Sequence, residues 1–475
     1  NEGKLLFVIN EIKAFQGAER VKVGIKKEGD TYSYILGRYS PQYPLVIDPD
    51  LDSLFASTYL GGIDEDWGYS ISVDGSGNVV LSGYTYSTDF PAISGYDTTF
   101  NGYCDAFVVK LNPDLSSLIA ATFLGGSYSD KCYSLYVDSS DNVFVTGRTS
   151  SSDFPIVNGY DSSYNGNDDA FVAKFNADLT SLLASTFLGG NSYDYGFSIY
   201  GNGSIYVTGA TYSQNFPALG GYDTTFNIGW DVFVAKFDGN LSTLLGSTYL
   251  GGSNNDEGFS IFVNDLGEVY LTGYTESPNF PAVNGYDTSF GDSSDVFVAK
   301  FTSNLDSLSA STFLGGNSVE WGYSLSVDHS GYVYVTGYTG SSDFPIVNGY
   351  DSTHNGYWDV FIAKLDGNLN SLVASTFLGG SNRDRATSIF VDESGNAFIT
   401  GETYSDEFPI VGGFDTSYHG SDDAFVAKFN ASLVKVSEPL ESRSQSQFFI
   451  RRNAIFFDLR EPSYVGISIY REDGR

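Results

Sequence analysis

The chain has 475 residues with 54 Gly, 35 Tyr and 37 Phe, and only 17% of its residues are charged. This composition is typical of a large all-β, turn-rich protein and argues against a helical or disordered chain. No apolar run reaches 18 residues, so we expect no membrane-spanning helix. The absence of Met, even at position 1, leads us to expect a processed chain or a fragment.

The formal net charge of −34 is concentrated in the middle of the chain. The two ends, 1–50 and 431–475, carry 14 basic and 13 acidic residues between them, so 51–430 holds 10 basic and 45 acidic residues. Such a surface repels phosphate backbones, which excludes nucleic acid as a partner. It suits cations or hydroxyl-rich neutral ligands, although a solvated acidic coat explains the same charge.

Residues 1–43 contain three strand-like runs, "LLFVIN", "RVKVGIKK" and "YSYILGRY". They predict an N-terminal β-rich segment ahead of the main domain.

Residues 44–432 contain an internal repeat. The string S/A-T-F/Y-L-G-G recurs at steps of 64 or 62 residues, with its Thr at 58, 122, 186, 248, 312 and 376. Each repeat has four strand-like runs, which in the second are 133–138, 142–149, 169–176 and 179–190. Four antiparallel strands repeated radially predict a β-propeller, since one turn of a β-helix needs far fewer residues.

The motifs "STFLGG", "YGFSIY", "IYVTG" and "DVFVAKF" resemble the SBBP repeat of bacterial and archaeal proteins, whose name means seven-bladed β-propeller. The resemblance implies a propeller fold and an extracellular location, while the biochemical role of the family is poorly defined. A weaker resemblance of "SISVDGSGNVVLSG" to NHL-type blades places this hairpin at the central channel. We call the strands of each blade a to d, from the channel outward.

Six complete a, b and c strands occur within 68–430, but "LDSLFASTYLGG" at 51–62 is needed to make six d strands. We therefore expect six blades closed by an N-terminal outer strand, which removes the free sheet edges. The alternative is a seventh blade assembled from residues 1–50.

Two connections of each blade, the d-to-a link and the long b-to-c loop with its D-F-P motif, are expected on one face. Function tends to lie on long loops held by a rigid scaffold, so we place the site there. An acidic residue precedes strand a in every repeat, and these residues predict a ring of carboxylates at the channel mouth. Calcium is the natural ion for oxygen ligands, although ordered water or a structural role fits these residues equally well. The ring residues are Asp66, Asp130, Asp194, Asp256, Glu320 and Asp384.

A second acidic set follows a Gly-Tyr pair within the long loop: Asp97, Asp161, Asp223, Asp287, Asp351 and Asp415. Asx-type turns explain these residues structurally. With the preceding aromatic residues they also suit a sugar ring, unless those rings are buried as loop core. The tyrosines are Tyr96, Tyr160, Tyr222, Tyr286 and Tyr350, with Phe414 in the sixth place. A third set, Asp105, Asp169, Asp231, Asp295, Asp359 and Asp423, begins strand c, where we expect bonds to backbone N–H groups or to the Lys of the same strand.

Cys104 and Cys132 are the only cysteines, and neither belongs to the repeat pattern. Both fall near the loop-bearing face, so we expect a disulfide that stabilises the fold by up to roughly 3 kcal/mol. The three His share no repeat phase, and no hydrolase or nucleotide-binding motif is present.

Residues 433–475 are a linker followed by "FFIRRNAIFFDLREPSYVGISIYREDGR", which resembles the start of a FlgD-like or type IX secretion sorting domain. This partial resemblance implies export and attachment to the cell surface. The sequence as a whole predicts a secreted or cell-surface, non-enzymatic binding scaffold. Its partner is a polysaccharide, a protein or further copies of itself. The alternative is a carboxylate-dependent hydrolase or lyase acting on polysaccharide at the channel mouth.

Overall fold

The computed structural model describes residues 13–16, 19–21, 23–28, 31–36, 45–48, 56–411, 415–431, 433, 448–451 and 454–457. The chain divides into two compact units. One is Ala56–Val436, and the other combines Asn1–Phe55 with Ser437–Arg475. The described residues form strands and no helix.

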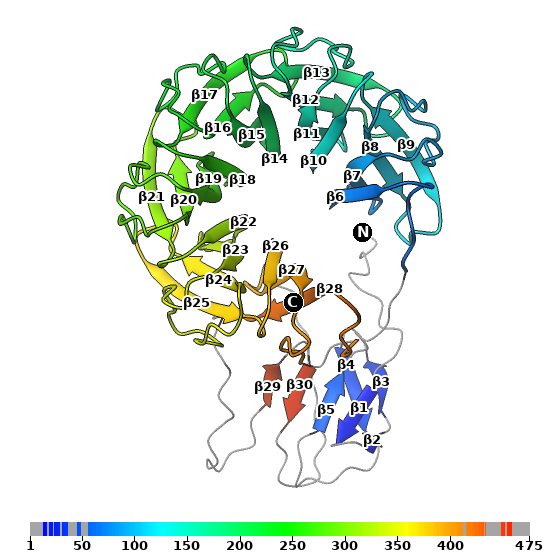
Figure 1. Ribbon diagram of the computed structural model, residues 1–475. Coiled ribbons are helices and arrows are strands. Elements are labelled where there is room, and N and C mark those ends of the chain that lie inside the picture. Colours follow the sequence, from blue (N-terminus) through cyan, green and yellow to red (C-terminus); the bar gives the residue numbers. More distant parts are fainter. Residues whose placement is uncertain are drawn as a thin grey trace. The chain divides into compact units, whose positions relative to one another are not determined.

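The larger unit is a β-propeller of six antiparallel sheets set around one axis (Figure 1). In the first five sheets, four strands follow one another in chain order from the axis outward. The six blades and their four-stranded meander confirm the fold predicted from the repeat. Six sheets, rather than seven, make up the described part of the ring.

The strands of the first three blades are β6 Asp66–Val73, β7 Val79–Thr85, β8 Asp105–Leu111 and β9 Leu118–Leu124; β10 Asp130–Val137, β11 Val143–Thr149, β12 Asp169–Phe175 and β13 Leu182–Leu188; β14 Asp194–Asn202, β15 Ser204–Thr211, β16 Asp231–Phe237 and β17 Leu244–Leu250. Those of the other three are β18 Asp256–Val263, β19 Val269–Thr275, β20 Asp295–Phe301 and β21 Leu308–Leu314; β22 Glu320–Val327, β23 Val333–Thr339, β24 Asp359–Leu365 and β25 Leu372–Leu378; β26 Asp384–Val391, β27 Ala397–Thr403 and β28 Asp423–Phe429.

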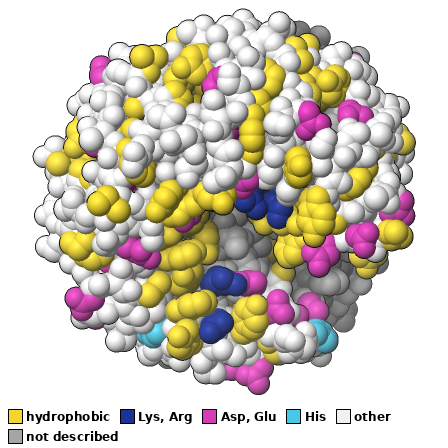
Figure 2. All heavy atoms as spheres, turned by 45° about the horizontal axis from the view of Figure 1, so that its top comes forward, with side chains coloured by type: hydrophobic (Ala, Val, Ile, Leu, Met, Phe, Trp, Pro, Cys, Tyr) yellow, Lys and Arg dark blue, Asp and Glu magenta, His cyan; other side chains and the backbone are white. Residues whose placement is uncertain are grey.

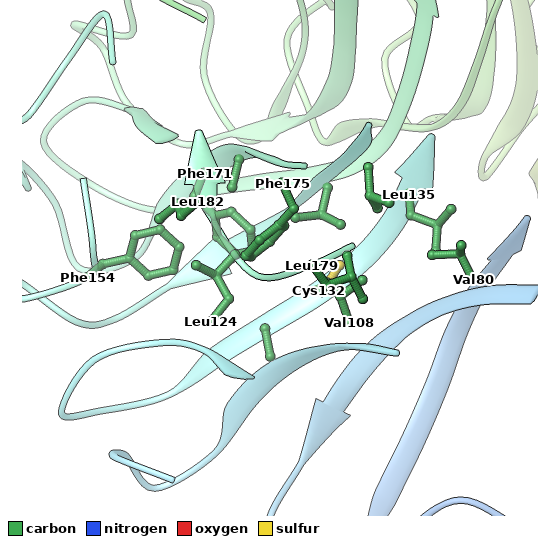
Figure 3. Packing of buried hydrophobic residues seen from close by; sticks show 14 of the residues in the cluster. Val80, Val108, Leu124, Cys132, Leu135, Phe154, Phe171, Phe175, Leu179 and Leu182 are labelled. Carbon is green, nitrogen blue, oxygen red and sulfur yellow. The ribbon is translucent and has the colours of Figure 1, made fainter. Parts of the chain in front are cut away.

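The core lies between neighbouring blades, because both faces of each inner sheet are apolar. Figure 3 shows the junction of the first two blades, where Val80 and Val108 pack against Cys132, Leu135 and Phe171 of the second. The same kind of cluster recurs at the next four junctions. Alternating Val, Ala and Phe on strand c therefore serve two junctions at once, one on each face of the sheet.

Polar bonds also repeat at each junction. The Ser134 hydroxyl accepts a hydrogen bond of 3.2 Å from the backbone N–H of Ile199 in the next blade. On strand c, Lys174 donates to the carbonyl oxygen of Gly239 in the next c-to-d turn, at 2.9 Å. Equivalent serine bonds occur at all five junctions between consecutive blades. These bonds fix the axial position of each blade on its neighbour.

The junction between the sixth and first blades differs from the other five. Ile71 is 71% exposed, while its five equivalents are at most 7% exposed. Val426 of β28 is 81% exposed, while its equivalents Val108 and Ile362 are fully buried. Beside the first blade lies a cavity of about 400 Å³, lined in part by Ala56, Leu60 and Ile71. The apolar faces at the two ends of the array are thus open to solvent.

The expected closing strand is not formed in the described residues. The sixth sheet contains β26, β27 and β28 only, and residues 56–62 are not in a strand. Leu60 nevertheless packs on the core of the first blade, as Leu124 packs on the second. Leu60 thus covers part of the first blade, but residues 56–62 do not pair with β28, whose outer edge has no strand partner in this part of the chain.

The smaller unit joins both ends of the chain in one sheet. Its strand order is β2-β1-β5-β30-β29, beside a separate β3–β4 hairpin. The antiparallel pairing of β30 with β5 brings Ile455 opposite Ile47. The strands are β1 Lys13–Gln16, β2 Glu19–Val21, β3 Val23–Glu28, β4 Thr31–Leu36, β5 Leu45–Asp48, β29 Phe448–Arg451 and β30 Ala454–Phe457.

Candidate functional site

The long b-to-c loop begins at the channel end of its blade and then runs along the outer strand. Near its start, the Ser151 hydroxyl accepts a hydrogen bond from the N–H of Tyr128 in the d-to-a link, which confirms that these two connections meet on one face. Further along, Val157 pairs with Ser185 of β13. The loop therefore covers the free edge of its own blade instead of projecting over the channel.

This path places the predicted Gly-Tyr-Asp residues at the outer edge of the propeller. Asp161 accepts a hydrogen bond of 2.8 Å from the N–H of Ser163, and its own N–H donates to the Thr186 hydroxyl. The same Asx turn forms at Asp97, Asp223, Asp287, Asp351 and Asp415. These carboxylates organise their own loops and do not converge with those of other blades.

The predicted tyrosines fill gaps between blades at this outer edge. The N–H of Tyr160 donates to the carbonyl oxygen of Leu241 in the next blade, and its ring packs edge-on against Phe237. Tyr96, Tyr222 and Tyr350 contact Phe175, Phe301 and Phe429 in the same way. Each of these rings is partly exposed at one edge. The sixth equivalent, Phe414, lies outside the described residues.

The predicted carboxylate ring is not exposed at the channel mouth. Asp130, Asp194, Asp256, Glu320 and Asp384 are fully buried, and only Asp66 is partly exposed. Asp194 accepts hydrogen bonds from the Gly190 N–H and from the hydroxyls of Thr211 and Ser213. The side chains point into their own loops because these donors surround them on the loop side. These carboxylates therefore lie at the start of strand a but are buried, and metal binding by them stays a prediction.

A different set of residues lines the channel on the loop-bearing side. The fourth residue of strand a is aromatic in five consecutive blades: Tyr69, Tyr133, Phe197, Phe259 and Tyr323. Neighbouring rings lie 5.3, 5.7, 5.3 and 5.3 Å apart between centroids. They form a continuous aromatic arc, which ends at Thr387 in the sixth blade.

The layer above this arc changes chemistry from blade to blade. The second residue of strand a is Trp67, Lys131, Tyr195, Glu257, Trp321 and Arg385 in chain order. Trp321 stacks on Tyr274 at 4.4 Å with an interplanar angle of 6°. Tyr195 packs on Trp230 at 5.1 Å. We call the aromatic arc and this layer together the mouth belt.

Basic residues gather at the mouth belt, although the propeller is strongly acidic. Residues 56–431 contain ten Lys and Arg. Six of them occupy the same place on strand c: Lys110, Lys174, Lys236, Lys300, Lys364 and Lys428. The other four, Lys131, Arg148, Arg383 and Arg385, all lie on the first or last residues of strands a and b or in the link before strand a. Figure 2 shows dark-blue Lys and Arg side chains with hydrophobic ones around the central hollow.

Arg148 is held at one side of the mouth by three contacts. It forms an ion pair of 2.6 Å with Asp168, donates to the Tyr133 hydroxyl at 3.0 Å and lies 4.8 Å from the Tyr195 ring centroid. Elsewhere at the mouth, Arg383 lies 4.7 Å from the ring of Trp358, and Arg385 pairs with Glu402. Guanidinium groups on aromatic faces present hydrogen-bond donors at fixed positions.

Glu257 is the acidic member of the mouth belt. The Tyr274 hydroxyl donates to it at 2.9 Å. Burial raises the pKa of Glu257, and the nearby charge of Glu276 adds to this effect. The mouth therefore combines aromatic faces, guanidinium groups and a carboxyl group, contributed by different blades.

Cys104 and Cys132 are free and buried thiols, so the expected disulfide is absent from this structure. Cys132 points into the core between the first two blades (Figure 3). The thiol of Cys104 lies 3.8 Å from the carbonyl oxygen of Asp130. Burial raises the pKa of both thiols to about 12. A common location near one face did not imply that the two side chains point toward each other.

The mouth belt was not predicted from the sequence, because the candidate sites were chosen among positions that keep the same residue from repeat to repeat. Positions 67, 131, 195, 257, 321 and 385 have the same repeat phase but hold five residue types, since only Trp occurs twice. The four basic residues outside strand c were the available signal. Among the described residues, no group of three or more His, Cys, Asp or Glu side chains is arranged to hold a metal ion. The described residues also include no helix long and apolar enough to cross a membrane.

Four segments of the chain match the SBBP β-propeller repeat: 57–91, 119–155, 311–345 and 375–409. No curated protein matches the chain. Two solved structures show a distant likeness. One is a subtype N11 neuraminidase-like protein of A/flat-faced bat/Peru/033/2010 (H18N11), at 12% identity over 78% of this chain and 90% of that one, with a TM-score of 0.37. The other is a duf4221 family member from Bacteroides vulgatus, at 11% identity over 79% and 98%, also with a TM-score of 0.37. Likenesses at this level carry no argument about activity.

Proposed function

We propose that this SBBP-repeat β-propeller is an extracellular, non-enzymatic binding scaffold that takes a carbohydrate ligand at the mouth belt. The aromatic arc across five blades is the observation that carries the proposal. Repeated residues elsewhere in the blades bond to their own loops or to the next blade. The side chains of the mouth belt, in contrast, are not needed to hold the loops or blades together.

The chemistry of the belt favours a hydroxyl-rich ligand. Partly exposed rings such as Trp67 (49% exposed) offer flat apolar surface for the faces of sugar rings. Arg148, Arg383 and Glu257 supply donors and an acceptor beside these rings. The 45 acidic residues of 51–430 disfavour nucleic acid at the same surface. An extracellular location agrees with such a ligand and with the family resemblance.

A glycan array followed by affinity electrophoresis with soluble polysaccharides tests the proposal. We expect binding to at least one polysaccharide, and a loss of tenfold or more in affinity for Trp321→Ala and for Tyr195→Ala. Leu183→Ala, on the exposed outer face of β13, is the matched control and should bind normally. Tyr160→Ala should lower the melting temperature without changing affinity. Equal binding by all folded variants would refute the mouth belt as the site.

A glycan-cleaving enzyme is the second candidate, and Glu257 is the observation that favours it. A carboxyl group with a raised pKa beside a second acidic residue, Glu276, is the arrangement that general acid catalysis uses. Incubation of bound polysaccharide with the protein should release no new reducing ends if the chain only binds. Release that is abolished by Glu257→Gln would replace the binding proposal with the enzymatic one.

A further inference from the structure

Each of the five closed junctions brings two buried carboxyl groups together. One begins strand c of a blade, and the other begins strand a of the next blade. The pairs are Asp105 with Asp130, Asp169 with Asp194, Asp231 with Asp256, Asp295 with Glu320, and Asp359 with Asp384. All ten side chains belong to residues that are at most 1% exposed. The pairing joins two of the acidic sets that the sequence placed apart.

The geometry is clearest at the junction of the second and third blades. Gly189 precedes the turn into β14, and a Cβ atom on it would lie 2.8 Å from Asp169 Oδ1 and 2.9 Å from Asp194 Oδ2. Gly125, Gly251, Gly315 and Gly379 stand between the other pairs in the same way. Only glycine leaves room for two carboxylates to approach the same backbone atom.

One carboxylate oxygen at this point lacks a hydrogen-bond donor. Asp169 Oδ2 accepts from the N–H of Asn165, but Oδ1 has no donor. The carbonyl oxygens of Gly190 and Ser192 face Gly166 together with that same Oδ1. The corresponding oxygen is also without a donor in Asp105, Asp231 and Asp295, whereas in Asp359 it accepts a hydrogen bond of 3.1 Å from the N–H of Gly356. A buried anionic oxygen that faces other oxygens is strongly destabilising unless a positive charge or a proton compensates it.

The sixth pair provides a comparison within the same chain. Asp423 and Asp66 are its members by repeat phase, but they belong to the open ends of the array. The three atoms nearest to a Cβ on Gly61 all belong to Asp66, whereas at the closed junctions they come from two carboxyl groups. Asp66 accepts hydrogen bonds from Gly62 and from the hydroxyls of Thr85 and Ser87, and it is partly exposed. The five described pairs therefore all belong to closed junctions.

We propose that each of the five closed junctions binds one calcium ion between the carboxylate that begins strand c and the carboxylate that begins the next strand a. Carboxylate and carbonyl oxygens are the ligands that calcium prefers. The ion joins neighbouring blades next to the loops, beneath the mouth belt.

Calorimetric melting and direct metal analysis test this proposal on the whole chain. After treatment with chelator and desalting at pH 7.5, calcium chloride should raise the melting temperature by several degrees, and magnesium or sodium chloride should do so much less. Protein equilibrated with calcium should retain about five ions per chain after gel filtration. Asp169→Asn should lower this number by one, whereas Asp161→Asn, in an exposed Asx turn, should leave it unchanged.

Metal analysis of the wild-type chain keeps the test decisive if Asp169→Asn does not fold. Absence of retained calcium together with an unchanged melting temperature would overturn the proposal. A melting temperature that ignores calcium but rises on acidification to pH 5 would also overturn it, because the pairs would then be compensated by a proton.

Discussion

Lys110 and Asp74 form a buried ion pair of 2.6 Å in the first blade, between strand c and the a-to-b turn. The side chains are 8% and 1% exposed. Lys110 also donates to the carbonyl oxygen of Ala177 in the second blade, at 2.9 Å. One ammonium group thus stabilises a turn in its own blade and a junction with the next.

Lys110→Met should lower the free energy of unfolding by roughly 3 kcal/mol, because it leaves the Asp74 carboxylate buried without its partner. Lys236→Met is the control. It removes a junction bond to Ser303, but its ammonium group lies over the Tyr206 ring and is not paired with a carboxylate in the described contacts. Urea unfolding should show the larger loss for Lys110→Met, and equal losses would contradict this account.

The same pair makes stability depend on acid pH. Although burial acts to raise it, hydrogen bonds from Lys110 and Asn78 lower the pKa of Asp74 to about 2, below the usual 3.8 of an aspartate. A carboxyl group with a depressed folded pKa contributes its stability above the unfolded pKa and loses it as pH falls through the folded one. The unfolding free energy should therefore fall between pH 4 and pH 2. Asp74→Asn should flatten this part of the profile, and an unchanged slope would count against the assignment.

Ser134→Ala should cost about 1 kcal/mol, because it removes the acceptor of the Ile199 N–H at the axis. The matched control is Ser388→Ala. Ser388 has the same phase in the sixth blade but is exposed, so its substitution should be nearly neutral. Chemical denaturation of both variants checks the difference. Equal effects would show that the axial bond does not contribute.

The two thiols should be unreactive in the native protein. Both are buried with pKa values raised to about 12, so little thiolate exists at pH 8. Iodoacetamide without reductant should label neither Cys104 nor Cys132 until the protein is unfolded, and should then label both. Unfolded protein that reacts only after reduction would show that the disulfide forms after all.

The repeat predicted the blades because each anchor has a direct structural reason. The Thr at 186 lies at the middle of strand d, where its hydroxyl receives the N–H of Asp161 from the covering loop. The D-F-P loop is repeated because Phe154 packs on Phe171 and Ser151 bonds to the link of the same face. Such contacts lie within one repeat or between neighbours, so the periodic sequence carries them.

The candidate site was harder to predict because it depends on the path of a loop and on residues that do not repeat. The long loop bonds along strand d, which moves Tyr160 and Asp161 to the outer edge. The direction of the loop decides whether its residues lie at the outer edge or at the channel mouth. No local sequence pattern encodes this direction. Arg148 was visible as a departure from the repeat, but the repeat alone did not indicate a function for it.

The serine bonds at the axis connect residues 63 to 65 positions apart and no others, from the first blade to the sixth. Because the apolar faces of the first and last described blades are not packed against each other, the stability of the propeller is expected to follow that of a linear repeat protein with two open ends. Its free energy of unfolding is then a sum of one term for each blade and one for each junction. Severing an interior link would split the array into two separately melting blocks, and unravelling would start at the terminal sheets.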